Sequence, residues 1–134
     1  MAYGNNQIPA QRLATAAIAA NCIIAEDERY DGQCVQATAN RGRLIGIGPV
    51  YAISASEMTQ ITIAGVAQLK IGSGGCAAGD RLISDASGNG VKMATGGTTP
   101  QHTVGIAVRS AAQNDIIPVQ VEIETMAPGA DYLS

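Results

Sequence analysis

The stretch from Gln60 to Gly72 alternates between two kinds of position with a period of two. One set of alternate positions is apolar or small: Ile61, Ile63, Gly65, Ala67, Leu69 and Ile71. The other set is mostly polar or small: Gln60, Thr62, Ala64, Val66, Gln68 and Lys70. This period and the β-branched content predict a strand with one buried and one solvent-facing side. We expect the rest of the fold to be arranged around this strand.

The glycine at the middle of the stretch predicts that the strand bends. A straight strand over these residues would be about twice the usual strand length. Gly65 falls on the expected buried side, where a missing side chain lets a strand kink or a neighbouring backbone approach closely. One strand that turns a corner can serve two sheet regions. The sequence therefore predicts an all-β fold, a small β-barrel or sandwich of short antiparallel strands.

Shorter apolar segments between turn residues predict the other strands and the domain organisation. The expected strands cover residues 22–25, 33–38, 44–48, 81–84, 91–94, 103–110 and 116–124. In the last of them we expect Val119, Val121 and Ile123 to face the core. The alanine-rich residues 12–20 suit either a short helix or an extended chain, and we favour the extended chain. We expect an extended N-terminal arm over residues 1–20, a β domain over 21–126 and a C-terminal tail over 127–134.

Two parts of the chain resemble each other faintly. Residues 32–38, followed by Ile45-Gly46-Ile47, parallel residues 90–95, followed by Val104-Gly105-Ile106. Both read as a turn glycine, a strand, an Ala-Thr pair, a polar loop and a strand that contains Gly-Ile. Alanine and threonine are common in this chain, so coincidence remains an alternative. The echo predicts two similar β units on either side of the long strand.

Composition limits how the fold can be stabilised. The chain has 134 residues, which predicts one domain, and it contains no Phe and no Trp. Alanine is the commonest residue, and it buries far less area than an aromatic side chain. A core of Ala, Ile and Val is thin, so we expect stability to be shared through oligomerisation or docking on a larger surface.

Charge and cysteine content argue against several functional classes. The net charge is −3 and the basic residues are scattered, which disfavours nucleic acid as a partner. We expect no membrane span and no secretory signal, because the sequence has neither a long apolar run nor a basic start followed by an apolar core. Cys22, Cys34 and Cys76 are widely spaced, so we expect free thiols and no metal site.

Three alternatives to a purely structural role remain, two of them based on single residues and one on a pocket. His102, the only histidine, is expected at the surface; a thiol or hydroxyl beside it in a cleft would instead support a hydrolase. Lys92 lies in a stretch that looks somewhat like the hairpin tip of biotinyl carrier domains, but it falls inside the return strand rather than at the turn. A small-molecule binding β module would need a deep pocket. We predict no catalytic residue, no cofactor and no metal.

Several segments together resemble the head decoration (capsid cement) proteins of tailed bacteriophages. They are Ile23-Ile24-Ala25 before Asp31-Gly32, residues 35–40, Ile45-Gly46-Ile47, residues 63–67, residues 78–88 and residues 104–107. The match covers roughly residues 20 to 124, and it consists of turn and strand patterns rather than a catalytic signature. The resemblance implies a β domain that binds the major capsid protein on the outside of the shell, often as trimers. It implies no enzymatic activity and no cofactor, and a place on the virion after synthesis in the bacterial cytoplasm.

The N-terminal arm is our candidate for the segment that becomes ordered on docking. The residues expected to contact the capsid or neighbouring subunits are Tyr3, Ile8, Arg12 and Leu13. A weak contact of this kind is repeated over many copies, so avidity raises the effective affinity without new chemistry.

Overall fold

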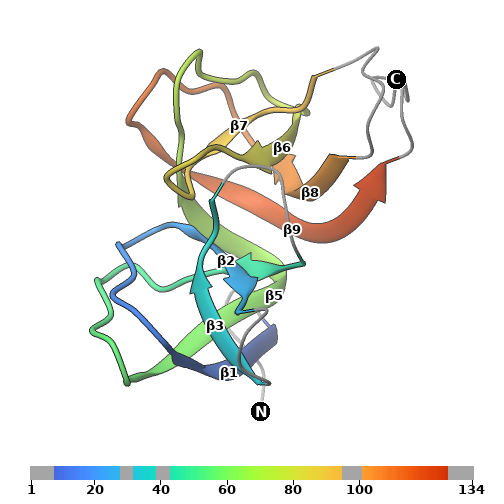
Figure 1. Cartoon of the computed structure of the whole chain (residues 1–134). Helices are drawn as coiled ribbons and strands as arrows, with labels where there is room; N and C mark the ends of the chain where they lie inside the picture. Colours follow the sequence, from blue (N-terminus) through green and yellow to red (C-terminus); the bar gives the residue numbers. More distant parts are fainter. Residues whose placement is uncertain (1–7, 28–31, 39–42, 95–100, 127–134) are drawn as a thin grey trace.

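The computed structural model describes residues 8–27, 32–38, 43–94 and 101–126 (Figure 1). These residues form strands and loops, without a helix, which confirms the all-β prediction. The strands are β1 (Ile8–Ala14), β2 (Ile23–Glu26), β3 (Gln33–Gln36), β4 (Leu44–Ile47), β5 (Met58–Lys70), β6 (Arg81–Ser84), β7 (Gly90–Lys92), β8 (Gln101–Ala107) and β9 (Ile116–Met126). Figure 1 shows two lobes, with β5 running from one to the other.

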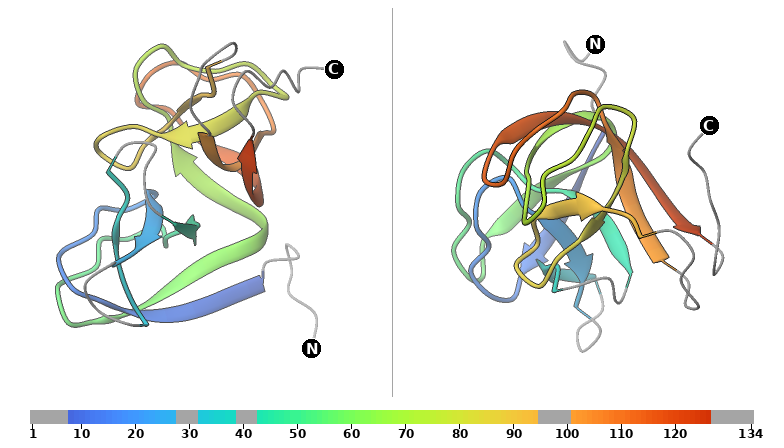
Figure 2. Two further views of the ribbon diagram at one scale, coloured as in Figure 1. Left: turned by 45° about the vertical axis from the view of Figure 1, so that its right-hand side comes forward. Right: turned by 90° about the horizontal axis from the view of Figure 1, so that it is seen from above.

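The long strand bends where the sequence predicted it. Gly65 has a φ of 91°, a left-handed conformation that favours glycine. Before the bend β5 pairs antiparallel with β1, and at Thr62 with β4. From Gly65 onward it pairs with β9 instead. The left panel of Figure 2 shows β5 turning the corner between the lobes, so one strand does serve two sheet regions.

The first lobe is a closed barrel in which β1 is the closing strand. The order is β1-β3-β2-β4-β5, and β1 also pairs with β5. On its other edge β1 runs parallel to β3, with Ala14 opposite Cys34. Residues 8–14 of the expected arm are therefore part of the barrel wall, and the β domain begins before residue 21. The sequence of β1 contains Pro, Gln and Arg rather than an alternating apolar pattern, so its role depends on the two strands beside it.

The second lobe repeats the first in strand order and pairing. The second half of β5 and strands β9, β8, β6 and β7 follow one another, and the parallel bridge between Ile71 and Gly90 takes the place of the β1–β3 pairing. The loops match as well, because the antiparallel bridge between Ile18 and Ile53 has its counterpart between Cys76 and Ala111. The chain is thus an internal duplication, and the two barrels share β5.

This duplication confirms the faint echo in the sequence, with one shift of register. Gly46 in β4 and Gly105 in β8 occupy corresponding positions, as predicted, since they pair with Ile24 and Leu82 of the corresponding strands β2 and β6. In the other half of the echo, the sequence alignment places residue 32 opposite residue 90. In the structure Cys34 pairs with Ala14, and Gly90 pairs with Ile71, the residue that corresponds to Ala14. Cys34, and not Gly32, is therefore the counterpart of Gly90.

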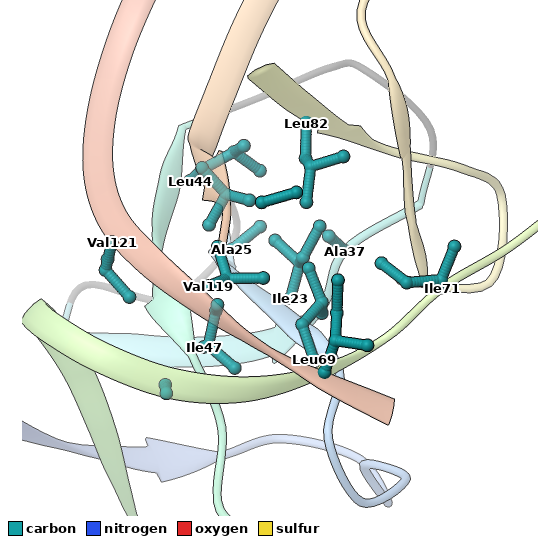
Figure 3. Packing of buried hydrophobic residues seen from close by; sticks show 14 residues of the cluster. Ile23, Ala25, Ala37, Leu44, Ile47, Leu69, Ile71, Leu82, Val119 and Val121 are labelled. Atoms are coloured by element: carbon teal, nitrogen blue, oxygen red, sulfur yellow. The ribbon is translucent and has the colours of Figure 1, made fainter. Parts of the chain in front are cut away.

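Two clusters of buried side chains form the core. The first fills the first barrel and consists of Ala14, Ile18, Ile24, Cys34, Ile53 and Ile61. The second combines residues of the second barrel, such as Leu69, Leu82 and Val119, with β2 and β4 residues of the first, such as Ile23 and Ile47 (Figure 3). Neighbouring residues of β2 therefore face different cores: Ile24 faces its own barrel and Ile23 the other. This sharing packs the two barrels together.

Two side chains that were expected in the core are exposed. Ile63 is 37% exposed and Ile123 is 38% exposed, so both predictions were wrong. Ile63 lies on β5 between Ile61, which belongs to the first cluster, and the residues of the second, and neither core covers it. Ile123 lies beyond Val121, the last residue of β9 that pairs with β5. The strand alternation is correct, but each exception falls where a strand leaves a barrel.

Candidate functional site

Of the predicted contact residues of the arm, the structure describes the side chains of Arg12 and Leu13, which are neighbours on β1. Tyr3 lies outside the described residues. Ile8 begins β1 opposite Ala64, and Leu13 is half-buried in the barrel wall. Arg12 places Nη1 3.5 Å from Oε1 of Glu26, which makes an ion pair within the barrel. Capsid contact through these residues stays a prediction.

His102 is half-buried in β8, and its Nδ1 lies 3.0 Å from Oγ1 of Thr125. A hollow of about 440 Å³ adjoins them, lined by Arg43, Leu44, His102, Ile123, Glu124 and Thr125. A histidine beside a hydroxyl in a hollow is the arrangement that supports the hydrolase alternative. However, His102 and Thr125 are directly opposite each other on β8 and β9, and cross-strand pairs of this kind are ordinary features of a sheet. The pairing explains the contact without a catalytic role.

Lys92 occupies a position that does not suit a carrier lysine. It ends β7, is exposed and pairs with Leu82. The preceding turn is organised by Asp85, whose Oδ1 accepts hydrogen bonds from the backbone N–H groups of Ser87 (2.8 Å) and Asn89 (2.9 Å). Lys92 therefore lies in the strand after the turn, as expected from the sequence, and not at the hairpin tip.

The three cysteines are free thiols without a reactive environment. Cys22 and Cys34 are buried and Cys76 is half-buried. Burial raises the pKa of each thiol above its ordinary value. Because the thiolate is the nucleophile and the metal ligand, a raised pKa opposes both roles near neutral pH. Within the described ranges no group of three or more His, Cys, Asp or Glu residues could hold a metal ion. No helix in this part of the chain could span a membrane.

The surface does present large apolar side chains at matching places on the two barrels. The exposed large apolar residues are Val50, Tyr51, Met58, Ile63, Val108, Ile116 and Ile123. Val50 and Val108 correspond, because each lies three residues before the bridging residue of its loop, Ile53 and Ala111 (53 − 50 and 111 − 108). Met58 and Ile116 correspond as the first residues of β5 and β9. We call these four residues the repeated apolar pairs.

The loops that carry these side chains are held by matching hydrogen bonds. The carboxylate Oε1 of Glu57 accepts a hydrogen bond from the N–H of Ser54 (2.7 Å). In the second barrel Oδ2 of Asp115 accepts one from the N–H of Ala112 (3.0 Å). Each acid directly precedes an exposed apolar residue, Met58 or Ile116. Similar hydrogen bonds therefore hold the chain next to the repeated apolar pairs in both barrels. The side chains of these four residues are between 47% and 66% exposed.

Sequence reasoning missed the repeated apolar pairs. The strands predicted from the sequence leave Val50 and Met58 outside any strand and include Val108 and Ile116. An apolar residue next to a strand looks like a core residue until the neighbouring elements are known. The available signal was the duplication itself, because an apolar residue at the same position of both units suggests a shared task.

A second hollow lies at the bend of β5 and bears on the small-molecule alternative. It encloses about 230 Å³ and is lined by Gly48, Pro49, Val50, Tyr51, Gln60, Ile61, Thr62, Ala67 and Gln68. Pockets for small molecules usually enclose about 300–1,000 Å³ and bury most of the ligand. This hollow is smaller than that range, whereas the hollow of about 440 Å³ beside His102 falls within it. In the smaller hollow the side chains of Val50 and Tyr51 are largely open to solvent, with exposures of 66% and 57%. This arrangement suits contact with another surface better than enclosure of a ligand.

Comparisons with known proteins show a likeness of fold. No family model matches this sequence, and no curated protein does. Among solved structures, the chain is similar to the N base of the head fiber gp8.5 of bacteriophage phi29. The TM-score is 0.59, the sequences are 19% identical, and the match covers 87% of this chain and 94% of the other. At this identity the match shows a shared fold. The resemblance to phage head proteins that the sequence indicated is thereby confirmed at the level of the fold.

Proposed function

We propose that this chain is a structural protein of a bacteriophage head that binds the outer surface of the capsid and stabilises it. The observation that carries the proposal is the fold, a double barrel shared with the base of a phage head fiber over most of both chains. The sequence resemblance to capsid decoration proteins points the same way. On this proposal the protein has no catalytic activity and needs no cofactor.

The repeated apolar pairs supply the contact surface in this proposal. Full burial of a Val, Met or Ile side chain contributes roughly 1.5–3 kcal/mol, and these four side chains are 47% to 66% exposed, so covering the rest of each contributes about half of that. Together the four contribute roughly 3–6 kcal/mol, which reaches only the lower estimates of about 4–15 kcal/mol for the loss of translational and rotational freedom on association. The contacts of one molecule therefore leave little surplus. Binding would be strengthened if neighbouring copies contact each other, for example as a trimer on the shell, because linked contacts multiply affinity.

Capsid binding is tested with heads of the phage that encodes this chain, prepared without the protein. The wild-type chain should sediment with these heads and raise their melting temperature. The double variant Val50→Asp/Val108→Asp places a charge in both contact areas, and we expect its affinity to fall by at least about a hundredfold, since each buried charge costs several kcal/mol. Gln113→Asp adds a charge at an exposed position of the same loop in the second barrel, and it should bind like wild type.

Folding of every variant is checked by circular dichroism before binding is measured. A wild-type chain that does not bind the heads contradicts the proposal. Binding that is unchanged in the folded double variant shows that the repeated apolar pairs are not the contact surface. An equal loss with Gln113→Asp would mean that general charge, rather than these four side chains, controls binding.

A hydrolase is the rival function, because His102 contacts the hydroxyl of Thr125 beside a hollow, and it is tested separately. The purified chain is incubated with a panel of ester and amide substrates beside the variants His102→Ala and Thr125→Val. We expect no turnover in any of the three. Turnover by wild type that is lost in both variants would replace the structural proposal. The carrier alternative is tested by the intact mass of protein purified from its host. A mass without an addition at Lys92 would reject that alternative.

A further inference from the structure

Among the strands that the structure describes, the C-terminal part of β9 is paired on one edge, with β8. From Ile116 to Val121 the strand lies between β5 and β8. Beyond Val121 it remains paired with β8, with Thr125 opposite His102 and Met126 opposite Gln101. β5 has turned away at Gly65 to pair with β1 and β4. In the described part of the chain the second edge of residues 122–126 therefore lacks a strand, as the right panel of Figure 2 shows.

The duplication shows what the same edge carries in the first barrel. Ala67 of β5 pairs with Val119 of β9, and Ala10 of β1 pairs with Ile61 of β5. Ala10 and Ala67 hold the same position in the two barrels, because Ala14 and Ile71, four residues further along, make the corresponding parallel pairings. Their partners Ile61 and Val119 therefore correspond, and residues 64–68 correspond to residues 122–126. Residues 65–68 are covered by β9, which runs antiparallel to them. In one barrel the continuing strand is thus paired by a later strand, and in the other barrel the equivalent edge is open.

We propose that an extended segment of a partner protein pairs antiparallel with residues 122–126 of β9. Addition of a strand to a free sheet edge is a common mode of peptide recognition, in which main-chain hydrogen bonds supply affinity and side chains supply selectivity. The β5–β9 pairing in the same molecule is the template for its direction. The site is five residues long, which is sufficient for a typical strand.

Charge determines which partner fits this edge. Glu122 and Glu124 both lie in the open segment. Glu124 places Oε2 3.8 Å from Nη1 of Arg81, so one cation already lies beside it, and a basic partner would add to this charge pairing. Self-pairing of two copies would bring four carboxylates together, and like charges on adjacent strands are destabilising. A segment with Lys or Arg residues is favoured instead.

An apolar residue in the partner would complete the contact. Ile123 is 38% exposed and lines the hollow of about 440 Å³ together with the buried Leu44. A Val or Ile side chain in that hollow would cover Ile123. The partner segment is therefore extended, with basic residues beside Glu122 and Glu124 and an apolar residue beside Ile123. This inference deepens the proposed function: it rests on that proposal for the identity of the partner, a capsid subunit, but not for the site.

The site is tested without a capsid, by amide hydrogen exchange of the full chain measured by NMR. The probes are two six-residue peptides with blocked ends, one alternating lysine and valine, the other alternating glutamate and valine. We expect the lysine peptide to slow exchange by about tenfold or more near saturation at those amides of residues 122–126 that point away from β8, since bound amides exchange only when the peptide dissociates. The glutamate peptide should have no effect.

Charge reversal gives the matched control. Glu122→Lys/Glu124→Lys should lose protection by the lysine peptide and gain it with the glutamate peptide. Gln120→Lys adds a positive charge to the part of β9 that is already paired with β5, and it should behave like wild type. Protection by neither peptide, equal protection by both, or protection that survives charge reversal would each overturn the inference.

The same measurement tests two other possible occupants of the edge, a second copy of the chain and residues 127–134. If a second copy occupies it, protection of residues 122–126 will rise with protein concentration in the absence of peptide, and this would overturn the inference. If residues 127–134 occupy it, their deletion will remove protection already present in the full chain, with the same consequence. Heads that bind the protein while the peptides do not would refute this inference alone; peptides that bind while heads do not would refute only the proposed function.

Discussion

Gly46 of β4 lies so close to the carbonyl oxygen of Thr62 in β5 that a Cβ atom at position 46 would collide with it. The second barrel repeats this relationship, because a Cβ at Gly105 of β8 would collide with the carbonyl oxygen of Gln120 in β9. Both collisions involve the backbone of the adjacent strand, which cannot move aside as a flexible side chain could. The duplicated barrel thus depends on a close approach that only glycine permits.

Replacing either of these glycines should destabilise the protein. We expect Gly46→Ala and Gly105→Ala each to lower the free energy of unfolding by about 1–3 kcal/mol or more, because overpacking forces the backbone to shift. Gly32→Ala is the control: Gly32 has a φ of 74° but nothing near the position of an added Cβ, so only the backbone penalty of about 1 kcal/mol applies. Urea denaturation measures all three. Equal losses would show that the close approach does not matter.

Thr59 offers a route to a more stable protein. Its side chain is fully buried, and its Oγ1 has no hydrogen-bond partner in the described structure. The thiol of Cys34 lies close enough for Thr59 to lower the pKa of that thiol, but a thiol is a weak hydrogen-bonding group and compensates little. The corresponding residue of the second barrel is the apolar Ile117. Thr59→Val should therefore raise the free energy of unfolding by about 1 kcal/mol, because it removes an unsatisfied buried hydroxyl.

The control for this change is Thr38→Val at an exposed position, which should alter stability by less than about 0.5 kcal/mol. Thermal and urea unfolding measure the free energy of unfolding of both variants and of wild type. A loss of stability in Thr59→Val, with Thr38→Val unchanged, would show that the hydroxyl makes a favourable interaction in the core.

The raised pKa values of the thiols predict a loss of stability at high pH. Unfolded thiols release their protons from about the ordinary value of 9.0, whereas burial keeps the folded thiols protonated to higher pH. Above that pH the unfolded state binds fewer protons than the folded state, so the free energy of unfolding falls as pH rises. Below it the thiols contribute no dependence on pH. Urea titrations at pH 8 and pH 10.5 should show the decline.

The variant Cys22→Ala/Cys34→Ala tests the origin of this decline. Its stability will be lower throughout, because it loses two buried side chains, but its decline between the two pH values should be smaller than that of wild type. A decline of the same size would assign the effect to other groups.

In the native wild-type chain at pH 8, alkylation should modify Cys76 first, because it is the only one of the three that is not fully buried.

Truncation should separate the N-terminal residues that hold the fold from those that do not. Deletion of residues 1–7 leaves β1 intact, so the free energy of unfolding should change by less than about 1 kcal/mol if these residues add little burial. Deletion of residues 1–12 removes most of β1 and opens the barrel between β3 and β5, and the transition should be largely lost or shifted to much lower urea. A folded, stable product of the longer deletion would show that the β1 pairings contribute little.

Binding to heads can then be compared between full chain and the shorter deletion alone. The predicted docking role of Tyr3 is tested by this comparison, because the fold is preserved. The role predicted for Arg12 and Leu13 is not open to deletion, since both lie in the barrel wall. Substitutions are needed there, and Arg12→Gln removes the ion pair with Glu26 while keeping the length of the side chain.

The local patterns of the sequence determined most of the strands and the bend. Alternation over residues 60–72 reflects which side of a strand is buried, and Gly65 marks the only residue type that readily takes its conformation, so both were readable without a structure. The turn after Asp85 is likewise local, because the carboxylate of Asp85 accepts hydrogen bonds from the N–H groups of Ser87 and Asn89, and Gly88 has a positive φ. The turn and strand patterns also carried the resemblance to the head decoration proteins of tailed bacteriophages.

Tertiary structure alone decided which residues those strands meet. β1 carries no alternating pattern, and its place in the wall depends on β3 and β5, which are distant in sequence. Ile61 and Leu69 share one side of β5 yet belong to different cores, because the strand leaves one barrel for the other between them. The exposure of Ile63 and Ile123 has the same cause. Burial on a strand is a property of its neighbours, so a sequence can give the period of two but not the point at which the neighbours end.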